Sequence, residues 1–126
     1  MKAKIIKKPN INEILKLSSI FRLESPINMN EYKTIIEFLD DDDNLIGFVN
    51  YVENHYLDYT KSFINMIYFT DNTYLDIMIK LMIKQLKQKK YSYALLNSEN
   101  DLFDKNTIKI LKSNDLTGDD LLFLNL

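Results

Sequence analysis

The sequence contains no cysteine, and only two glycines and two prolines occur among its 126 residues. Without cysteine the chain cannot build a disulfide scaffold, a thiolate zinc site or a cysteine nucleophile. It also lacks a Walker phosphate loop, a Ser-His-Asp order, zinc-ligand spacing and a helix-turn-helix signature. The sequence therefore contains none of these motifs from which an activity could be assigned directly.

A charge excess and long apolar runs are also missing. Sixteen basic and 18 acidic residues give a formal net charge of −2, so we expect no nucleic acid and no anionic membrane as partner. No apolar run is long enough to span a bilayer, and the N-terminal MKAKIIKKPN has too short an apolar centre for a signal peptide. These observations predict a cytoplasmic protein.

The composition is that of a folded domain. Hydrophobic residues make up 46% of the chain and charged residues 27%, which is typical of globular proteins. A length of 126 residues predicts a single domain over residues 1–126. Abundant isoleucine, lysine and asparagine suggest an A+T-rich genome, such as that of a low-G+C bacterium or its phage.

The first half of the chain predicts a strand, a helix and a hairpin. MKAKIIKK is a strand, and Asn10 with Glu13 three residues later begins a helix that ends before Ser25-Pro26. The apolar stripe of this helix is predicted as Ile11, Ile14, Leu15, Ser18 and Phe21. Period-two patterns predict strands in EYKTIIEFLD, LIGFVNYVENHYL and KSFINMIYFT. The acidic run between the first two lacks the spaced ligands of a calcium loop, so we interpret it as a turn.

IYFTDNTYLDIMIKLMIKQLKQKK predicts a strand end followed at once by a helix over Thr73–Lys89, capped by Asp71 or Thr73. Its main apolar stripe is Leu75, Met78, Ile79, Met82 and Leu86. Further apolar residues outside the stripe, Ile77, Leu81 and Ile83, predict burial on more than one side. The lysines of KQLKQKK suit a helix C-terminus, with phosphate contact as the alternative.

The remaining chain predicts a strand in YSYALLN, a helix in FDKNTIKILKSND and one last strand in DDLLFLNL. The fold class is therefore α+β with a mixed sheet, in the order β-α-β-β-β-α-β-α-β. An antiparallel meander is followed by a crossover to a parallel strand. A single terminal strand leaves one side unpaired, which predicts a protein partner or self-association through this sheet edge.

This order resembles the GNAT superfamily of N-acetyltransferases. DDDNLIGFVNYV is similar to the family's hairpin, and SYALLNSENDLFDKNTIKILKSNDL to its fifth strand and fourth helix. The resemblance implies that acetyl-CoA phosphates bind where the fourth strand meets the next helix. Members carry Gln/Arg-x-x-Gly-x-Gly/Ala there, and glycine permits close approach to the helix N-terminus.

This chain departs from that pattern. Thr70 takes the place of Gln/Arg, Thr73 and Leu75 replace the glycines, and Asp71 adds a negative charge. Asp104 stands for the family's Asn, Asp115-Leu116 for its Gly-Phe, and NTIKILKSND has no tyrosine to act as general acid. Acetyl-CoA is therefore expected to bind weakly or not at all. The cofactor-binding candidates are Ile67 and Tyr68 through their backbone, with Thr70, Asn72 and Thr73.

Acetyl transfer to an amine needs a base near the amine and donors for the oxyanion. Glu53 and His55 are the candidate bases, although a lone histidine there is also compatible with an exposed residue of no catalytic role. Asn97 and Ser98 follow a predicted parallel strand, where ligands often bind, but they also suit an ordinary turn. No metal site is predicted.

Three hypotheses follow. The first is a GNAT-like protein with a reduced or lost acetyl-CoA site that acts by protein-protein interaction. The second is an active acetyl-CoA-dependent N-acetyltransferase of unknown acceptor. The third is an unrelated α+β binding domain with the same order of elements.

Overall fold

The computed structural model describes residues 1–23, 32–56, 59–69, 72–96, 105–117 and 122–126. Its elements are β1 (Lys2–Lys7), α1 (Ile11–Phe21), β2 (Thr34–Leu39), β3 (Leu45–Tyr56), β4 (Tyr59–Phe69), the 3₁₀ turn η2 (Asn72–Tyr74), α2 (Leu75–Gln88), β5 (Tyr93–Leu96), α3 (Lys105–Lys112), β6 (Leu116–Thr117) and β7 (Leu122–Asn125). No helix in the described part is long and apolar enough to cross a membrane.

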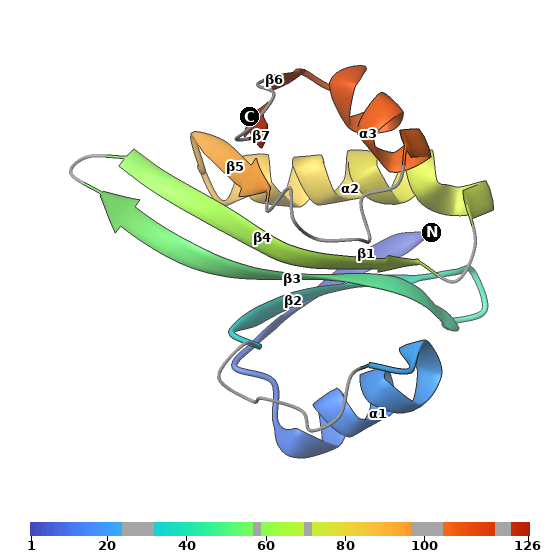
Figure 1. Ribbon diagram of the computed structural model, residues 1–126. Helices are drawn as coiled ribbons and strands as arrows, with labels where there is room; N and C mark the ends of the chain where they lie inside the picture. The colour runs from blue at the N-terminus through green and yellow to red at the C-terminus, as the bar shows by residue number, and fades with distance from the viewer. Residues whose placement is uncertain (24–31, 57–58, 70–71, 97–104, 118–121) are drawn as a thin grey trace.

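The strands form one sheet in the order β1-β2-β3-β4-β5-β7-β6 (Figure 1). The pairs from β1 to β4 are antiparallel, β5 runs parallel to β4, and β7 is antiparallel to both of its neighbours. The parallel pair follows from α2, because a helical crossover returns the chain in the same direction. The predicted mixed α+β sheet is confirmed.

The prediction of a single terminal strand is wrong. Two strands follow α3, and β7 lies between β5 and β6 instead of at an edge. The two-residue β6 is too short to leave a periodic pattern in the sequence. It follows Asp115, whose positive φ of 73° turns the chain sharply after α3. The unpaired edge that DDLLFLNL was expected to present therefore does not exist.

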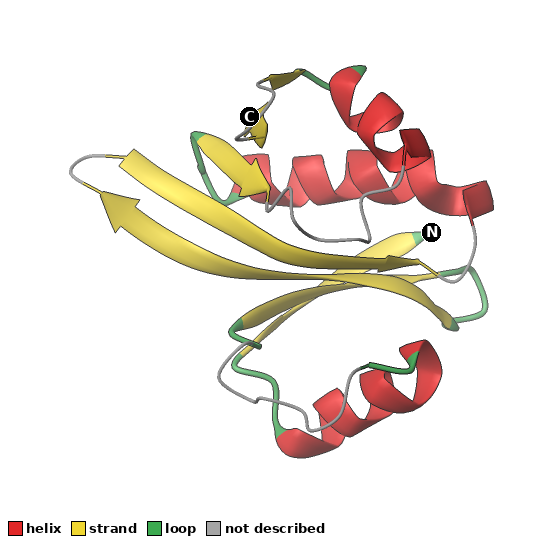
Figure 2. Cartoon of the chain, in the orientation of Figure 1, coloured by secondary structure: helices red, strands yellow, loops and turns green. Residues whose placement is uncertain are grey.

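Helices cover both faces of the sheet (Figure 2). α1 lies on one face, and α2 and α3 lie on the other. The larger core cluster joins α2 to side chains such as Ile36 and Phe38, and a smaller one joins α1 to Ile35 and Phe48. Neighbouring residues of β2 thus belong to different cores, because successive side chains of a strand point to opposite faces.

The capping of α1 is confirmed. Asn10 is its N-cap, and the side-chain Oδ1 accepts a hydrogen bond of 2.9 Å from the backbone N–H of Glu13. We expect Asn10→Ala to lower the free energy of unfolding by about 1 kcal/mol, because it leaves a helix N–H without its acceptor. Urea unfolding measures the change. Asn10→Asp, which keeps the oxygen, is the control, and an equal loss in both variants would contradict this capping role.

The predicted apolar stripe of α1 is partly wrong. The fully buried positions are Ile14 and Leu17, whereas Ile11 is 50% and Leu15 51% exposed. The helix is rotated so that Leu17, which the stripe omitted, joins Ile14 in the smaller core. Phe21 contacts Phe48 as a member of the predicted stripe, with ring centroids 5.2 Å apart. It also ends earlier than expected, at Phe21, where the next residue adopts a left-handed conformation. Part of the apolar surface of α1 therefore faces outward.

The stripe predicted for α2 is confirmed, since all five of its members are buried. Ile83 is buried too, as expected. Ile77 is 47% exposed, so the prediction that it is buried beside the stripe is wrong. The helix begins at Leu75, two residues later than predicted, because η2 precedes it. Thr73 is therefore not the helix cap, and Asp71 lies outside the described residues.

The acidic run forms the turn between β2 and β3, as predicted. Asp40 Oδ1 accepts the backbone N–H groups of Asp42 and Asn44, each at 2.9 Å, and these bonds hold the pKa of Asp40 below its usual value. Asp43 pairs with Lys2. Within the described ranges no group of three or more potential metal ligands occurs.

Candidate active site

An irregularity in β4 marks the middle of the sheet. Asn50 of β3 lies opposite Met66, but the next residue, Tyr51, lies opposite Ile64. Asn65 is therefore an extra residue in β4, which is the definition of a β-bulge. A bulge bends its strand and interrupts the ladder of backbone hydrogen bonds.

The bulge coincides with the end of the pairing between β4 and β5. Lys61 to Ile64 pair with Tyr93 to Leu96, the last residue of β5. β4 continues to Phe69, so its second half extends well past the end of β5 (Figure 1). Among the described strands, only β3 pairs with this half of β4. Backbone groups of a bent strand next to a parallel neighbour that has ended can bind a ligand lying between the two.

β4 leads to the start of α2, where an anion would meet the helix N-terminus. Tyr74 occupies the N-cap position of α2 without a side-chain capping bond, and Thr73 and Tyr74 are both exposed. Leu75 is fully buried in the core, so its side chain does not block this surface, contrary to expectation. Of the two residues that replace the family's glycines, Thr73 alone therefore has a side chain that could obstruct a phosphate. Thr70 lies outside the described residues.

The nearest described acid is Asp76 in the first turn of α2. Its carboxylate forms an ion pair of 3.0 Å with Lys80, one helical turn later, and both side chains are largely exposed. A carboxylate at this position competes with an incoming anion for the helix N-terminus. The ion pair reduces that competition without removing it, because exposed pairs are weak.

A second cluster lies beneath the C-terminal end of α2. Tyr51 and Glu53 are two residues apart on β3, and Tyr91 precedes β5. The Tyr91 hydroxyl donates a hydrogen bond to Glu53 Oε1, and its ring lies edge-on to Tyr51 with centroids 6.1 Å apart. Tyr51 is fully buried and Tyr91 is 5% exposed. The Glu53 carboxylate is therefore engaged by a buried phenol.

Both phenols resist ionisation. Burial raises the pKa of Tyr91 far above its usual value, and the hydrogen bond to the Glu53 carboxylate raises it further. Burial also raises the pKa of Tyr51, an effect that the neighbouring Tyr91 hydroxyl offsets only in part. Both side chains are thus neutral at physiological pH, and the Tyr91 hydroxyl is the donor to Glu53.

These raised pKa values predict a loss of stability in alkali. Above about pH 10 an unfolded tyrosine loses its proton while the folded one keeps it, so stability falls as the pH rises. At pH 11 the loss attributable to Tyr91 is about 1.4 kcal/mol, because an unfolded tyrosine is then largely ionised. We expect Tyr91→Phe to be less stable than the wild type at pH 8 but to lose less stability between pH 8 and pH 11 in urea unfolding. An identical alkaline loss in both proteins would contradict the assignment.

The structure separates the predicted site residues into two groups. Ile67 and Tyr68 lie beyond the bulge, opposite Val49 and Phe48, and lead toward Asn72 and Thr73 at the start of α2. Glu53 and His55 lie on the other side of the bulge, toward the end of the hairpin. With a rise of about 3.3 Å per residue, they are roughly 7 and 13 Å from Tyr51. The His55 side chain is outside the described part.

Sequence reasoning missed the contribution of Tyr51 and Tyr91. The period-two spacing of Tyr51 and Glu53 indicated that they share one face of β3. Nothing in the sequence placed Tyr91 beside them, because that contact joins residues 38 positions apart. Asn97, Ser98 and Asp104 lie outside the described residues.

Comparison with known proteins gives similarity in structure alone. No protein-family model matches the sequence. No curated protein matches it either. Sequence similarity therefore identifies neither the reaction nor the substrate.

Solved structures resemble the chain over nearly its whole length. The E. coli protein YhhK bound to coenzyme A has a TM-score of 0.69 at 14% identity, covering 99% of this chain and 98% of its own. A chain of the NatC complex bound to Gag peptide and CoA has a TM-score of 0.63 at 12% identity, covering 100% and 99%. A ribosomal-protein-alanine N-acetyltransferase from Brucella melitensis biovar Abortus has 0.65 at 13%, covering 94% and 93%. The chain therefore has the GNAT-like fold that its order of elements predicted.

Proposed function

We propose that this chain is a GNAT-fold protein with a reduced acetyl-CoA site that acts by binding another protein. The observation that carries the first part is the joint between β4 and α2. It lacks glycine, it exposes Thr73 and Tyr74 at the helix start, and it places Asp76 in the first turn. A helix N-terminus alone contributes only about 0.3–2 kcal/mol toward an anion. That is too little to hold a large, flexible cofactor.

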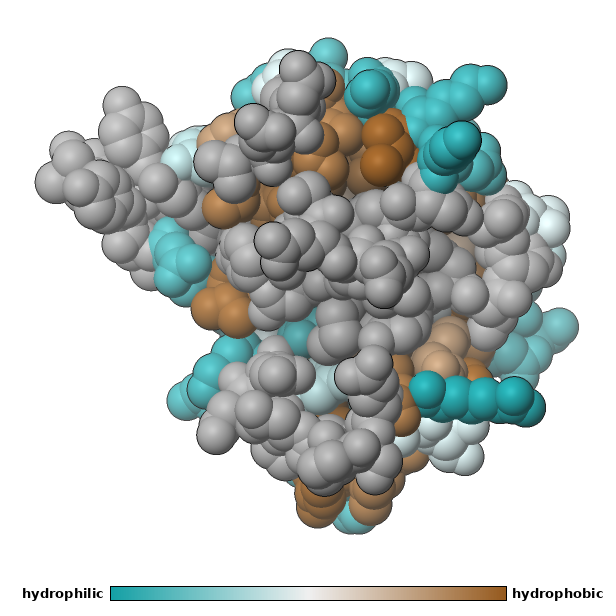
Figure 3. Space-filling model, viewed as in Figure 1, coloured by the Kyte–Doolittle hydropathy of each residue, from teal (hydrophilic) through white to brown (hydrophobic). Residues whose placement is uncertain are grey.

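Exposed apolar side chains support the second part. Ile11 and Leu15 are one turn apart on α1 and are both about half exposed. Figure 3 shows hydrophobic surface at the lower end of the molecule, in the region of α1. Apolar residues that gather on a surface are a feature of protein contact sites. A helix face is also a better candidate than a sheet edge, because β1 carries exposed lysines, which discourage pairing, and β6 has only two residues.

The bulge supports the alternative, an active acetyl-CoA-dependent N-acetyltransferase. A cofactor between β4 and the end of β5 would bind backbone groups near Ile67 and Tyr68, with its phosphates near Asn72 and Thr73. Such donors do not depend on side chains. Glu53 is then a better candidate base than His55, because it lies closer to the bulge and its carboxylate is positioned by Tyr91. Two of the solved neighbours described above hold CoA.

Calorimetric titration with acetyl-CoA separates the two proposals. We expect binding weaker than about 100 µM, since the joint supplies few converging donors. Micromolar binding that is lost in Asn72→Trp, which crowds the joint, would overturn the proposal and favour the enzyme. In that case loss of acetyl transfer to a panel of peptide amines in Glu53→Gln, with acetyl-CoA affinity retained, tests the base.

A further inference from the structure

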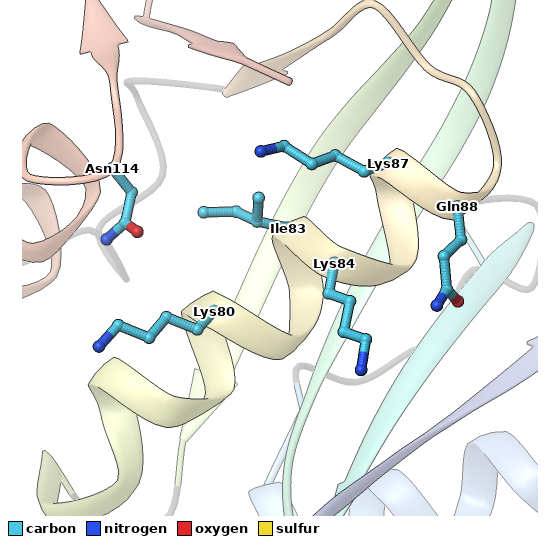
Figure 4. A pocket seen from close by; sticks show the side chains of 6 residues that line it. All are labelled: Lys80, Ile83, Lys84, Lys87, Gln88 and Asn114. Carbon is cyan, nitrogen blue, oxygen red and sulfur yellow. The ribbon is translucent and has the colours of Figure 1, made fainter.

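A groove on the outer side of α2 is lined by lysines. It has a volume of about 450 Å³, and its lining residues are Lys80, Ile83, Lys84, Lys87 and Gln88 from α2 and Asn114 from the turn after α3 (Figure 4). Ile83 is 9% exposed and forms an apolar floor. The groove therefore combines three ammonium groups with two amides and one apolar surface.

The side chains come from two flanks of the helix. In Figure 4, Lys80, Ile83 and Lys87 point toward the side of Asn114, and Lys84 and Gln88 extend along the neighbouring flank. Lys80 and Lys87 are seven residues apart, which is about 10 Å along a helix. Ammonium groups over this span can contact several phosphates of one ligand at the same time.

The amide of Asn114 has a fixed orientation. Its Nδ2 donates to the carbonyl oxygen of Ile110 at 2.8 Å, and therefore Oδ1 is turned toward the groove. A ligand in the groove meets a positioned acceptor from Asn114 opposite the cationic side chains of α2. Phosphates alone cannot use that acceptor, whereas a sugar or base with hydroxyl or amino groups can.

The described side chains that line the groove carry three positive charges and no negative one, although the chain as a whole carries −2. Among its described lining residues none is a carboxylate, and Lys80 pairs with Asp76 at 3.0 Å. Within the described ranges Lys84 and Lys87 form no ion pair. A second exposed row, Lys105, Lys109 and Lys112, follows the adjacent α3 with the same spacing. Such a field attracts anions beyond what capping a helix C-terminus requires.

We propose that this groove binds a multiply phosphorylated small molecule of nucleotide size. Its volume lies in the range of small-molecule sites, and lysine is an established phosphate ligand. The groove is short and none of its described lining residues is aromatic, so base stacking is not provided for, which disfavours single-stranded nucleic acid. It is also separate from the joint, because Lys84 lies about 13 Å along α2 from Leu75.

Titration of the full chain with ADP and with inorganic tripolyphosphate, at about 0.15 M salt and without metal, tests the proposal. The variant Lys80→Gln, Lys84→Gln and Lys87→Gln should bind ADP about 30-fold more weakly, roughly threefold for each exposed charge. A control with Lys4→Gln, Lys16→Gln and Lys33→Gln loses the same net charge at exposed positions outside the groove. Its affinity should stay within about twofold, because screening weakens distant charges.

The Asn114→Leu variant addresses the nucleoside part. It should weaken ADP binding and leave tripolyphosphate binding unchanged, since only the nucleoside can donate to Oδ1. Equal losses of ADP affinity in the groove and control variants would overturn the proposal as non-specific attraction. So would absence of ADP binding while polyglutamate or a single-stranded oligonucleotide binds the groove. Loss of ADP binding in Thr73→Trp, with no loss in the groove variant, would place the ligand at the joint and also overturn it.

Discussion

Replacing Thr73 with glycine should tighten acetyl-CoA binding about tenfold or more. Thr73 lies in η2, exposed, two residues before α2 begins. Glycine there removes a branched side chain and allows backbone conformations that bring N–H groups to contact distance with a phosphate. One additional hydrogen bond to a charged group is worth about 1.5–3 kcal/mol. Each 1.4 kcal/mol corresponds to about a factor of ten in Kd.

Thr73→Val is the matched control. Valine keeps the branch at Cβ and the backbone restriction of threonine but removes the hydroxyl, so it reports any effect of the hydroxyl alone. Calorimetry should give wild-type or weaker acetyl-CoA affinity for Thr73→Val and a gain only for Thr73→Gly. If glycine brings no gain, Thr73 does not limit the site. The reduced affinity would then need another cause.

The directions of the strands from β2 to β5 were predictable because they depend on local pattern and on general rules of connection. The period-two run around Ile36 predicted a strand, and the helix between β4 and β5 predicted a parallel pair. β6 could not be found in this way, because a strand of two residues is too short to show an alternation of apolar and polar side chains. The rotation of α1 was missed for a related reason. Its apolar residues cover more than one stripe, and the packing of Ile14 and Leu17 against the sheet decides which stripe faces it.

The candidate site was less predictable than the fold. The family pattern located a helix start after β4, but the helix begins later than expected, at Leu75, because η2 precedes it. The bulge at Asn65 could not be located from the sequence. A bulge depends on the register between two strands, and no residue type in β4 indicates it. The bond between Tyr91 and Glu53 likewise depends on how α2 returns the chain to the sheet. Long-range register therefore determines which polar residues meet.

The largest effect on stability is expected from Leu86→Ala. Leu86 is fully buried in the core cluster between α2 and the sheet. Removing a buried leucine side chain loses the free energy of its transfer from water and leaves a cavity, at a cost of about 2–5 kcal/mol. That is a large part of the total of about 5–15 kcal/mol expected for a domain. Urea unfolding should show a markedly lower midpoint, with a similar dependence on denaturant.

Leu15→Ala makes the same chemical change on α1, where the side chain is 51% exposed. The substitution removes less buried apolar surface and leaves no cavity, so the loss in free energy of unfolding should be below about 1 kcal/mol. Equal losses in the two variants would mean that α1 buries Leu15, and the exposed pair with Ile11 would then be no contact surface. A small loss for Leu15→Ala leaves a folded protein with an altered α1 face. That variant can test partner binding without the complication of unfolding.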